Sequence, residues 1–285
     1  MPYTVCNIDK NSFNSVIAKK MGFYQSHQYD LAYMFQRYSL NPNNFVEWFI
    51  QKINLTGNEV ALELGCLSES YWIHDFKYAH LFKKLYLVDE KIENVLHAKR
   101  ILKSFSNTNI SLSQCETLNI EDKMLDLAYS HNIDLKTNDS NQVSLLSELL
   151  RVLKDEGTFY YTYIAEDYYA SLYKLLYEYD PNLFTEDQIF NYIKNNQSEM
   201  REILTNTFSN VEVDEFQSHW VVDNIDDLIG FILCDQVLSA LKYTIFQDGL
   251  SSFRRFLKMK IDHLGGINIQ RRVIVMTCRG KRTYT

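Results

Sequence analysis

Short hydrophobic runs alternate with longer amphipathic segments along the middle of the chain. Each short run is rich in leucine, β-branched or aromatic residues, which is the pattern of a buried strand. Each longer segment repeats its apolar positions every three or four residues, as a helix does. The expected strands are Val60–Leu64, Lys84–Val88, Asn109–Ser113, Leu125–Tyr129 and Thr158–Ile164, and the expected helices between them are Tyr71–Phe82, Ile92–Phe105 and Val143–Leu153.

This regular order of strands and helices predicts an α/β fold with a doubly wound, mostly parallel sheet. The sequence KDEG, Lys154–Gly157, is interpreted as the stop of the helix before the fifth strand. Two later strands, Val211–Val222 and Asn268–Thr277, complete an expected seven-stranded sheet. The remaining segments, 166–208 and Asn224–His263, have a helical pattern.

The segment before the first strand is expected to be helical. Its candidate helices are Ser12–Met21, Tyr29–Tyr38 and Pro42–Ile53. Asn41 is the expected N-cap of the last of these, and Pro42 suits a first helical position. The residues that recur on one face of this helix are expected to pack on the sheet; they are Phe45, Phe49 and Ile53.

The stretch Asn58–Ser70, NEVALELGCLSES, joins the first expected strand to a polar turn. The strand ends in an acid and a glycine, and a helix is expected to begin after the turn. In α/β folds such a turn lets a ligand approach the backbone N–H groups of a helix N-terminus. We therefore expect a nucleotide-type site at this end of the sheet.

Composition adds an aromatic character and an uneven charge. The 285 residues include 20 Tyr and 17 Phe but only 3 Pro and 9 Gly, which favours long helices and a pocket with aromatic walls. The net charge is −7, although residues 251–285 hold nine Lys/Arg against one acid, Asp262. The acidic remainder argues against nucleic-acid binding, which depends on phosphate neutralisation. The basic residues within Phe253–Leu264 are interpreted as the solvated face of an amphipathic helix, with docking of an anionic acceptor or an acidic carrier protein as the alternative.

The five cysteines are scattered without metal-ligand spacing, so we expect free thiols in a reducing cytoplasm and no bound metal. The N-terminal sequence has no basic region followed by an apolar core, and no apolar run is long enough to span a bilayer. A cytoplasmic protein without a membrane partner is expected, and a homodimer is an open alternative.

Four segments, in this order, resemble the class I S-adenosylmethionine-dependent methyltransferases. They are ELGC (Glu63–Cys66), YLVDE (Tyr86–Glu90), QCETLNIEDKMLDLAYSH (Gln114–His131) and LSELLRVLKDEGTFYYTYI (Leu146–Ile164). Within that superfamily the sequence is similar to small-molecule enzymes of the trans-aconitate, ubiquinone-biosynthesis and malonyl-carrier-protein type. The likeness covers Phe45–Ile164 and continues more loosely to the end, by the order of the elements.

The resemblance implies one Rossmann-like domain over residues 1–285. Its parts are an N-terminal helical lid (1–41), a cofactor-binding core (42–164) and the remaining strands, whose helical insertions form a lid over the acceptor (165–285). It implies S-adenosylmethionine as the cofactor and S-adenosylhomocysteine as the product. The expected reaction is methyl transfer to an O, N or C atom of a small molecule.

The resemblance also implies which residues contact the cofactor. Asp89, 24 residues after Gly65, is expected to accept both ribose hydroxyls. Gly65 lets the backbone approach the methionine part, and Glu63 orders the loop or receives the ammonium group. The alternatives are a solvated strand end, a plain turn glycine and a loop-bracing acid. The expected cofactor-binding residues are Glu63, Gly65, Cys66, Ser68, Asp89, Glu90, Gln114, Cys115, Glu116, Ser130, Tyr29 and Arg37.

The turn after the first strand departs from the family, which usually continues Gly-Cys-Gly-x-Gly. Here Leu67 and Glu69 replace two glycines, and Glu69 can repel the carboxylate of the cofactor. Gln114 stands where the family often has an acid that binds the adenine amine, and its amide oxygen can still accept that hydrogen bond. The departures leave a second hypothesis, a catalytically inactive relative that serves as a binding or partner subunit. Non-methylating use of the cofactor is a third hypothesis, and the missing G-x-G-x-x-G argues against a nicotinamide enzyme.

Methyl transfer from a sulfonium needs positioning, exclusion of water and, for some acceptors, a base. His131, just past the fourth expected strand, is the candidate catalytic base; the alternative is a histidine that shapes the pocket or binds the cofactor. Tyr33 and Arg37 share one helix face with Tyr29. In similar enzymes such a helix closes over the cofactor, and aromatic faces can stabilise a sulfonium; aromatic packing with a surface arginine is the alternative.

The acceptor pocket is the least specific of these predictions. Its candidate residues are Tyr24, Tyr33, Tyr163, Tyr168 and Trp220. For the last three of them, ordinary core or lid packing is the favoured interpretation.

Overall fold

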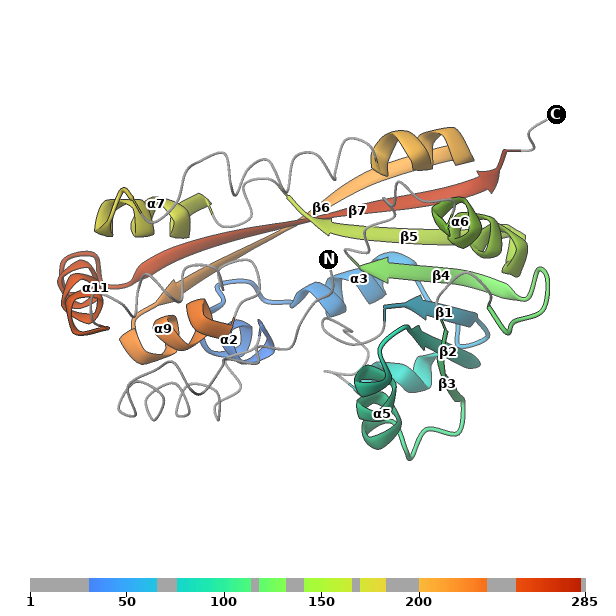
Figure 1. The fold of residues 1–285 in the computed structure, drawn as a ribbon, viewed down its shortest axis with the longest axis horizontal. Coiled ribbons are helices and arrows are strands. Elements are labelled where there is room, and N and C mark those ends of the chain that lie inside the picture. The colour runs from blue at the N-terminus through green and yellow to red at the C-terminus, as the bar shows by residue number, and fades with distance from the viewer. Residues whose placement is uncertain are drawn as a thin grey trace. The chain divides into compact units, whose positions relative to one another are not determined.

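A computed structural model describes residues 31–65, 76–113, 118–131, 141–165, 170–182, 200–234 and 250–282. Seven strands form one sheet in the order β3-β2-β1-β4-β5-β7-β6 (Figure 1). They are β1 (Val60–Leu64), β2 (Lys84–Asp89), β3 (Thr108–Leu112), β4 (Leu125–His131), β5 (Leu153–Ile164), β6 (Phe208–Val222) and β7 (Ile267–Lys281). Strands β1 to β5 pair in parallel, and β7 is antiparallel to β5. The predicted α/β class and the mostly parallel seven-stranded sheet are confirmed.

The α-helices with defined bounds are α2 (Leu31–Tyr38), α3 (Phe45–Ile53), α5 (Ile92–Ile101), α6 (Asn141–Val152), α7 (Ala170–Tyr179), α9 (Ile225–Cys234) and α11 (Leu250–Leu264). Residues 200–207 are also helical. Where the helix Tyr71–Phe82 was predicted, the described part is a 3₁₀ helix, η1 (Phe76–Leu81), so an α-helix is wrong there. The side-chain amide of Asn107 donates to the carbonyls of Ala79 and Phe82, which ends this tight turn.

The chain divides into two compact units. The described residues of unit 1 fall within Met1–Pro42, Tyr169–Thr185 and His219–Gln270, and those of unit 2 within Asn43–Tyr168, Glu186–Ser218 and Arg271–Thr285. Strands β6 and β7 each contribute residues to both units. The division into an N-terminal lid, a core and an acceptor lid stays a prediction.

Helix α3 begins three residues later than predicted. Its N-cap is Asn44, whose side chain accepts from the Glu47 N–H at 2.9 Å, while Glu47 accepts from the Asn44 N–H at 3.1 Å. This reciprocal capping box outcompetes the predicted start at Asn41 and Pro42. The Asn41 side chain instead accepts from the N–H of His219 at 2.9 Å.

Strand β5 begins five residues earlier than predicted, because Lys154–Gly157 belong to the strand and form no helix stop. The register shifts in this part, where Leu125 pairs with Leu153 but Leu127 pairs with Thr158. The extra residues therefore form an irregularity of the bulge type. A Cβ at Gly157 would lie 2.7 Å from Leu153 Cγ, which is too close. The glycine therefore leaves room for this buried leucine side chain.

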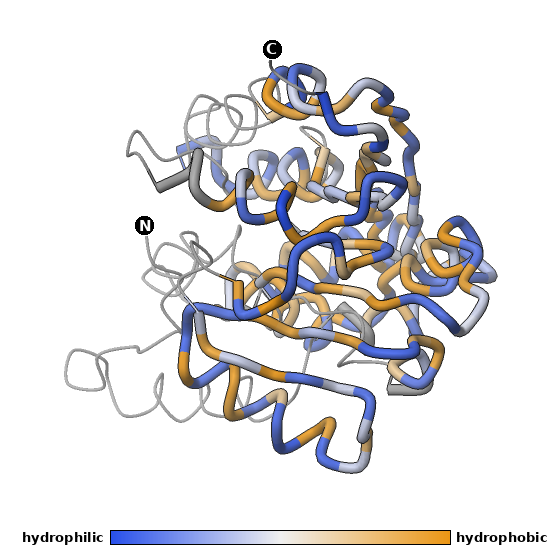
Figure 2. Tube along the Cα trace, turned by 90° about the vertical axis from the view of Figure 1, so that its right-hand side faces the viewer, coloured by the Kyte–Doolittle hydropathy of each residue, from blue (hydrophilic) through white to orange (hydrophobic). Residues whose placement is uncertain are grey.

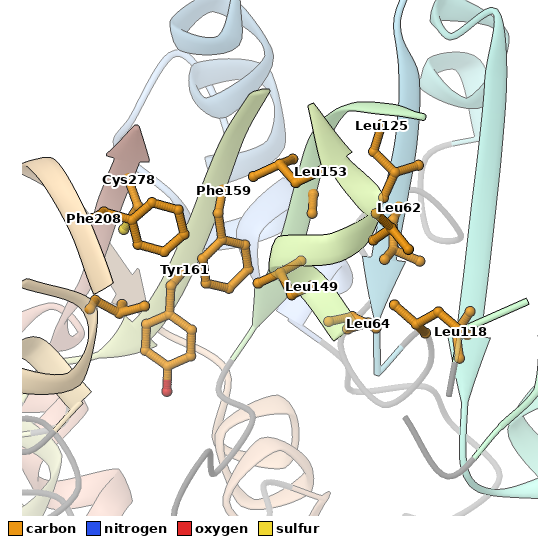
Figure 3. Packing of buried hydrophobic residues seen from close by; sticks show 14 of the residues in the cluster. Leu62, Leu64, Leu118, Leu125, Leu149, Leu153, Phe159, Tyr161, Phe208 and Cys278 are labelled. Carbon is orange, nitrogen blue, oxygen red and sulfur yellow. The ribbon is translucent and has the colours of Figure 1, made fainter. Parts of the chain in front are cut away.

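The sheet of unit 2 is covered by helices on both faces. On one face α6 contributes Leu149 and Val152 to a core that includes Leu62, Leu64 and Phe159 (Figure 3). Side chains alternate between the faces of a strand, so the residues next to these point the other way. There the Phe49 ring of α3 packs against Tyr129 and Tyr160, at centroid distances of 5.0 and 5.3 Å. The prediction that α3 packs on the sheet is confirmed.

Hydropathy follows this layering. The strands of the parallel part carry long hydrophobic stretches, and the chain turns hydrophilic at many of their ends (Figure 2). Strands β1 and β2 are buried at every position but the first, whereas the edge strand β3 is half-buried or exposed. β3 is therefore the edge strand of the parallel part, in which β2, β1 and β4 are interior strands.

Candidate functional site

The carboxyl ends of β1, β2 and β4 lie side by side at one edge of the sheet. Leu64, the last residue of β1, pairs with Val88 on one side and with Ser130 on the other. Asp89 ends β2 and pairs with Leu112 of β3, and its carbonyl accepts from the N–H of Ser113 at 3.1 Å. The pairing therefore brings together the strand ends at which the sequence predicted a nucleotide-type site.

Gly65 is the turn residue at the end of β1. Its φ of 77° lies in the left-handed region, where a residue with a Cβ is strained. Its N–H donates to the carbonyl of Val88 at 2.9 Å, which fixes the turn to the neighbouring strand. The glycine is thus required by the backbone, and it leaves no side chain between the turn and an approaching ligand.

Asp89 is only 5% exposed, and two hydrogen bonds hold its carboxylate in one orientation. One carboxylate oxygen accepts from the Lys91 N–H at 2.8 Å, and the other accepts from Nδ2 of Asn94 at 3.0 Å. An ionised carboxylate has about four acceptor positions, so these two bonds leave about half of them for a ligand. Sequence reasoning missed Asn94, because its position in the first turn of α5 carries no signal of this contact.

Of the other described residues in the predicted cofactor set, Glu63, Ser130 and Glu90 lie at this edge, whereas Arg37 belongs to unit 1. Glu63 is buried in β1, on the face opposite Leu62 and Leu64. Ser130 is fully buried near the end of β4, and its hydroxyl has no hydrogen-bond partner within the described ranges. Glu90 is exposed directly after β2. His131 is the last residue of β4 and pairs with Thr162 of β5, so its backbone lies at the same edge.

Part of the predicted site lies outside the described residues. This holds for eight residues of the predicted cofactor and acceptor sets: Cys66, Ser68, Gln114, Cys115, Glu116, Tyr24, Tyr29 and Tyr168. The side chain of His131 is outside the description as well. Their roles stay predictions.

A second cluster of polar side chains, in unit 1, gathers on Asp227. Its Oδ2 accepts from the Tyr33 hydroxyl at 2.9 Å and from the Tyr38 hydroxyl, and it pairs with Arg37 Nε at 3.2 Å. Asp227 lies in the first turn of α9, whose N-terminal N–H groups donate to the side chain of Asn224. The prediction that Tyr33 and Arg37 share a helix face is confirmed, because both reach the same carboxylate.

Asp227 was missed by sequence reasoning. An acid in the first turn of a helix is ordinarily explained by the helix dipole, and nothing in the sequence links it to Arg37. Burial, followed by the hydrogen bond to Asp227, raises the pKa of both Tyr33 and Tyr38 above the ordinary value of 10.0. Tyr38 is buried, whereas half of the Arg37 side chain is exposed, so the hydrogen bond of Tyr38 matters more to folding than the ion pair.

Asp227→Asn should lower the free energy of unfolding by about 1–2 kcal/mol, because an amide is a weaker acceptor and its NH2 opposes the Arg37 donor. Since the folded state raises both tyrosine pKa values, their contribution to stability is complete below pH 10 and is lost as the pH rises further. Urea unfolding at pH 7 and above pH 10 measures both effects. Asp227→Asn should therefore lose less stability than the wild type does between pH 7 and high pH. The control is Asp223→Asn, a substitution of an exposed acid that should keep the wild-type pH dependence. An alkaline loss as steep in Asp227→Asn as in the wild type would contradict this assignment.

Comparison with known proteins adds the identity of the fold. No protein-family model matches the sequence, and no curated protein matches it. A solved structure from Bacillus halodurans, provisionally named a methyltransferase, is 13% identical with a TM-score of 0.50, covering 84% of this chain and 100% of that one. Another from Anaeromyxobacter dehalogenans, provisionally named a type II methyltransferase, is 16% identical with a TM-score of 0.50 and covers 76% of this chain and 86% of that one.

The chain has the class I methyltransferase fold. At these identities the likeness concerns the fold alone. In this methyltransferase fold, Gly65 directly follows β1, and Asp89 ends the neighbouring strand β2. The resemblance inferred from four short segments of sequence is therefore confirmed at the level of the fold.

Two of the predicted acceptor residues lie in hydrophobic packing of the methyltransferase fold. Tyr163 of β5 is 9% exposed and packs against Tyr161, at a centroid distance of 5.9 Å. Trp220 of β6 is fully buried and contacts the Phe231 ring edge-to-face at 5.4 Å. Core packing, which was the favoured interpretation for both, accounts for these positions, and a contact with an acceptor stays a prediction.

The basic residues of α11 are largely engaged in ion pairs. Arg254 pairs with Asp226, Lys260 pairs with Glu178, and Lys258 pairs with Asp262 one turn along the helix. Phe253 and Leu257 are buried, so the predicted amphipathic character is confirmed. Within the part of the chain that the structure describes, no helix is long and apolar enough to cross a membrane, and no group of three His, Cys, Asp or Glu residues is arranged to hold a metal.

Proposed function

We propose that the chain binds S-adenosylmethionine at the carboxyl ends of β1 and β2 and transfers its methyl group to an O, N or C atom of a small molecule. The observation that carries this proposal is the Asp89 carboxylate, which is buried, held by two donors and left with unused acceptor positions. It ends the strand next to the one that carries the left-handed Gly65. A carboxylate and a close backbone turn at neighbouring strand ends suit a ribose and its attached chain.

Different residues at this edge would bind different parts of the cofactor. Asp89 would accept the two ribose hydroxyls, and the N–H of Lys91 and the amide of Asn94 would keep its oxygens aimed. The turn at Gly65 would let the methionine part approach the backbone. Ser130 offers a buried hydroxyl without a partner in the described ranges, next to Leu64 in register. The cofactor, when bound, supplies a methyl group activated on a sulfonium.

His131 remains the candidate base for an acceptor that must lose a proton. Its position after Ser130 at the end of β4 supports this role, because the backbone there belongs to the same edge as Gly65 and Asp89. Acceptors that are already nucleophilic need positioning rather than a base. Replacement of His131 would then lower turnover while leaving cofactor affinity in place.

A second candidate function is a catalytically inactive relative that serves as a binding or partner subunit. Its support is the sequence after Gly65, where Leu67 and Glu69 stand in place of the two usual glycines. A bulky side chain and a negative charge at this turn oppose a ligand that carries a carboxylate. The two functions differ in whether the cofactor binds at all.

Isothermal titration calorimetry with S-adenosylmethionine and S-adenosylhomocysteine separates the two functions. The enzyme proposal predicts saturable binding of both ligands at one site, with a dissociation constant in the micromolar range. Failure to bind either ligand at millimolar concentration would refute the proposed enzyme and favour the inactive relative. Titration with NAD under the same conditions controls for unspecific binding of an adenine nucleotide.

A further inference from the structure

Strand β3 is the last strand on its side of the sheet, and its sequence does not protect that edge. Its residues, Thr108–Leu112 (TNISL), include no charge and no proline, and their pairing with β2 runs without a register shift. Natural sheets usually block an exposed edge with lysine, proline or a bulge, because an open edge pairs with other chains. The opposite edge strand, β6, is charged, since it carries Glu212, Asp214 and Glu215.

The backbone of β3 points hydrogen-bonding groups outward at alternate residues. The carbonyl of Asn107 accepts from β2 at 2.9 Å, and the N–H of Ser113 donates to β2 at 3.1 Å. Successive residues of a strand point these groups to opposite sides, so the odd-numbered residues bind β2. The N–H and carbonyl groups of Ile110 and Leu112 therefore point away from β2, where a further strand could bind them.

Exposed apolar side chains accompany this edge. Leu112 is 52% exposed, and α5 adds Ile92 and Leu96, which lie one turn apart and are 47% and 59% exposed. Leu112 pairs with Asp89, whose side chain binds Asn94 of α5, so Leu112 shares the face of the sheet that α5 covers. Helix α5 lies beside β2 and β3 (Figure 1). We call the edge of β3 together with these three side chains the β3–α5 surface.

The charges of α5 make this surface complementary to itself. The first turn carries the acid Glu93, and the last turn carries the bases Lys99 and Arg100; all three are exposed. Around a two-fold axis two copies of a helix run antiparallel, so residues from opposite ends face each other. The acid of each copy then faces the bases of the other. The partner that this charge pattern favours is a second copy of the same chain.

Pairing of the two β3 edges would also bring the two helices together. Antiparallel pairing around a two-fold axis keeps both copies of α5 on the same face of the joined sheet. Neighbouring strands lie about 4.8 Å apart, and packed helices lie about 8–10 Å apart. Because α5 covers the part of the sheet next to β3, its copy across the joined edge would lie within packing distance. Leu96, in the middle of α5, would then meet Leu96 of the second copy.

We propose that the β3–α5 surface is the interface of a homodimer, in which two copies pair their β3 strands antiparallel and pack their α5 helices side by side. The backbone groups of Ile110 and Leu112 pair across the axis. Ile92, Leu96 and Leu112 lose their contact with water. The inference is independent of the proposed function, because it uses the outer edge of the sheet and needs no bound cofactor.

Sedimentation equilibrium of the full chain without ligand tests the dimer. A small interface of this kind has a dissociation constant of about 10 µM, so the wild type should be mainly monomeric at about 1 µM and mainly dimeric at about 100 µM. Leu96→Glu places two like charges together at the axis. It should raise the dissociation constant by about 30-fold and leave the chain mainly monomeric at about 100 µM.

The matched control is Val213→Glu on β6. It makes the same kind of change at an apolar residue that is 44% exposed, but on the opposite edge strand, so it should keep the wild-type dissociation constant. Leu112→Lys tests the strand separately from the helix, because lysine is a usual blocking residue of sheet edges, and it should also prevent the dimer. Melting temperatures show that each variant folds, and Leu112→Lys carries the test if Leu96→Glu does not fold.

Hydrogen exchange tests the strand pairing itself. If only the monomer exchanges, the N–H groups of Ile110 and Leu112 should exchange about fourfold more slowly at about 100 µM than at about 1 µM. In Leu96→Glu their exchange should change much less with concentration. A wild type that stays monomeric at 100 µM would overturn the inference. So would a dimer that neither folded variant weakens, or one in which these two N–H groups exchange as fast as in the monomer.

Discussion

Asp89→Ala should lower the affinity for S-adenosylhomocysteine by about 100-fold. The variant removes the proposed acceptor of both ribose hydroxyls. Hydrogen bonds to a charged group contribute about 1.5 kcal/mol or more each, which sums to about 3 kcal/mol. The carboxylate is already oriented by Lys91 and Asn94, so the free protein spends little entropy in presenting it. Isothermal titration calorimetry measures the dissociation constants of the wild type and of the variant directly.

The control for this variant is Glu93→Ala, an exposed acid in the first turn of α5, close to Asp89 in sequence. It changes the charge near the site by the same amount but leaves the oriented acceptor in place, so its affinity should stay within about threefold of the wild type. Melting temperatures of both variants show whether folding is retained. Unchanged affinity in a folded Asp89→Ala protein would refute the assigned site.

Phe159→Ala should lower the free energy of unfolding by about 4 kcal/mol, the usual cost of a large cavity in a close-packed core. Phe159 is fully buried in β5, opposite Cys278 of β7, and its ring lies 6.2 Å from Phe208 and 6.4 Å from Tyr161. These neighbours come from three strands, so the cavity cannot be filled by a shift of one side chain. Urea unfolding followed by circular dichroism measures the loss.

Two substitutions calibrate the result for Phe159. Phe159→Leu keeps most of the volume and should cost about 1.5 kcal/mol. Leu96→Ala removes a leucine that is 59% exposed on α5, and it should change the free energy of unfolding by no more than about 0.5 kcal/mol. If Phe159→Ala lowers the free energy of unfolding by less than about 1.5 kcal/mol, the ring does not occupy the core position that the structure gives it.

The parts of the fold that follow a strong period were predictable from sequence. Val60–Leu64 and Lys84–Val88 are mostly hydrophobic, and both form neighbouring parallel strands within one residue of the predicted bounds. Errors occurred where a specific pairing overrode the local signal. Lys154–Gly157 contains three charged residues and a glycine, yet it joins β5, where Leu153 is buried and Lys154 pairs with Asp126.

Residues of the candidate site were predictable where they directly follow a hydrophobic strand. Asp89 and Gly65 could be placed because each directly follows a hydrophobic run, and strands of a parallel sheet end at one edge. Asn94 and Asp227 could not be found in the same way. The partner of Asn94 lies 5 residues away and those of Asp227 lie 189 to 194 residues away, at positions that only the folded chain brings together.

The central claim, that a cofactor binds over the ends of β1 and β2, is tested most directly by a crystal structure of the chain grown with S-adenosylhomocysteine. The account predicts both ribose hydroxyls within about 3 Å of the Asp89 carboxylate, and the homocysteine part against the turn at Gly65. A ligand bound elsewhere on the chain, with the Asp89 carboxylate free of it, would contradict the account.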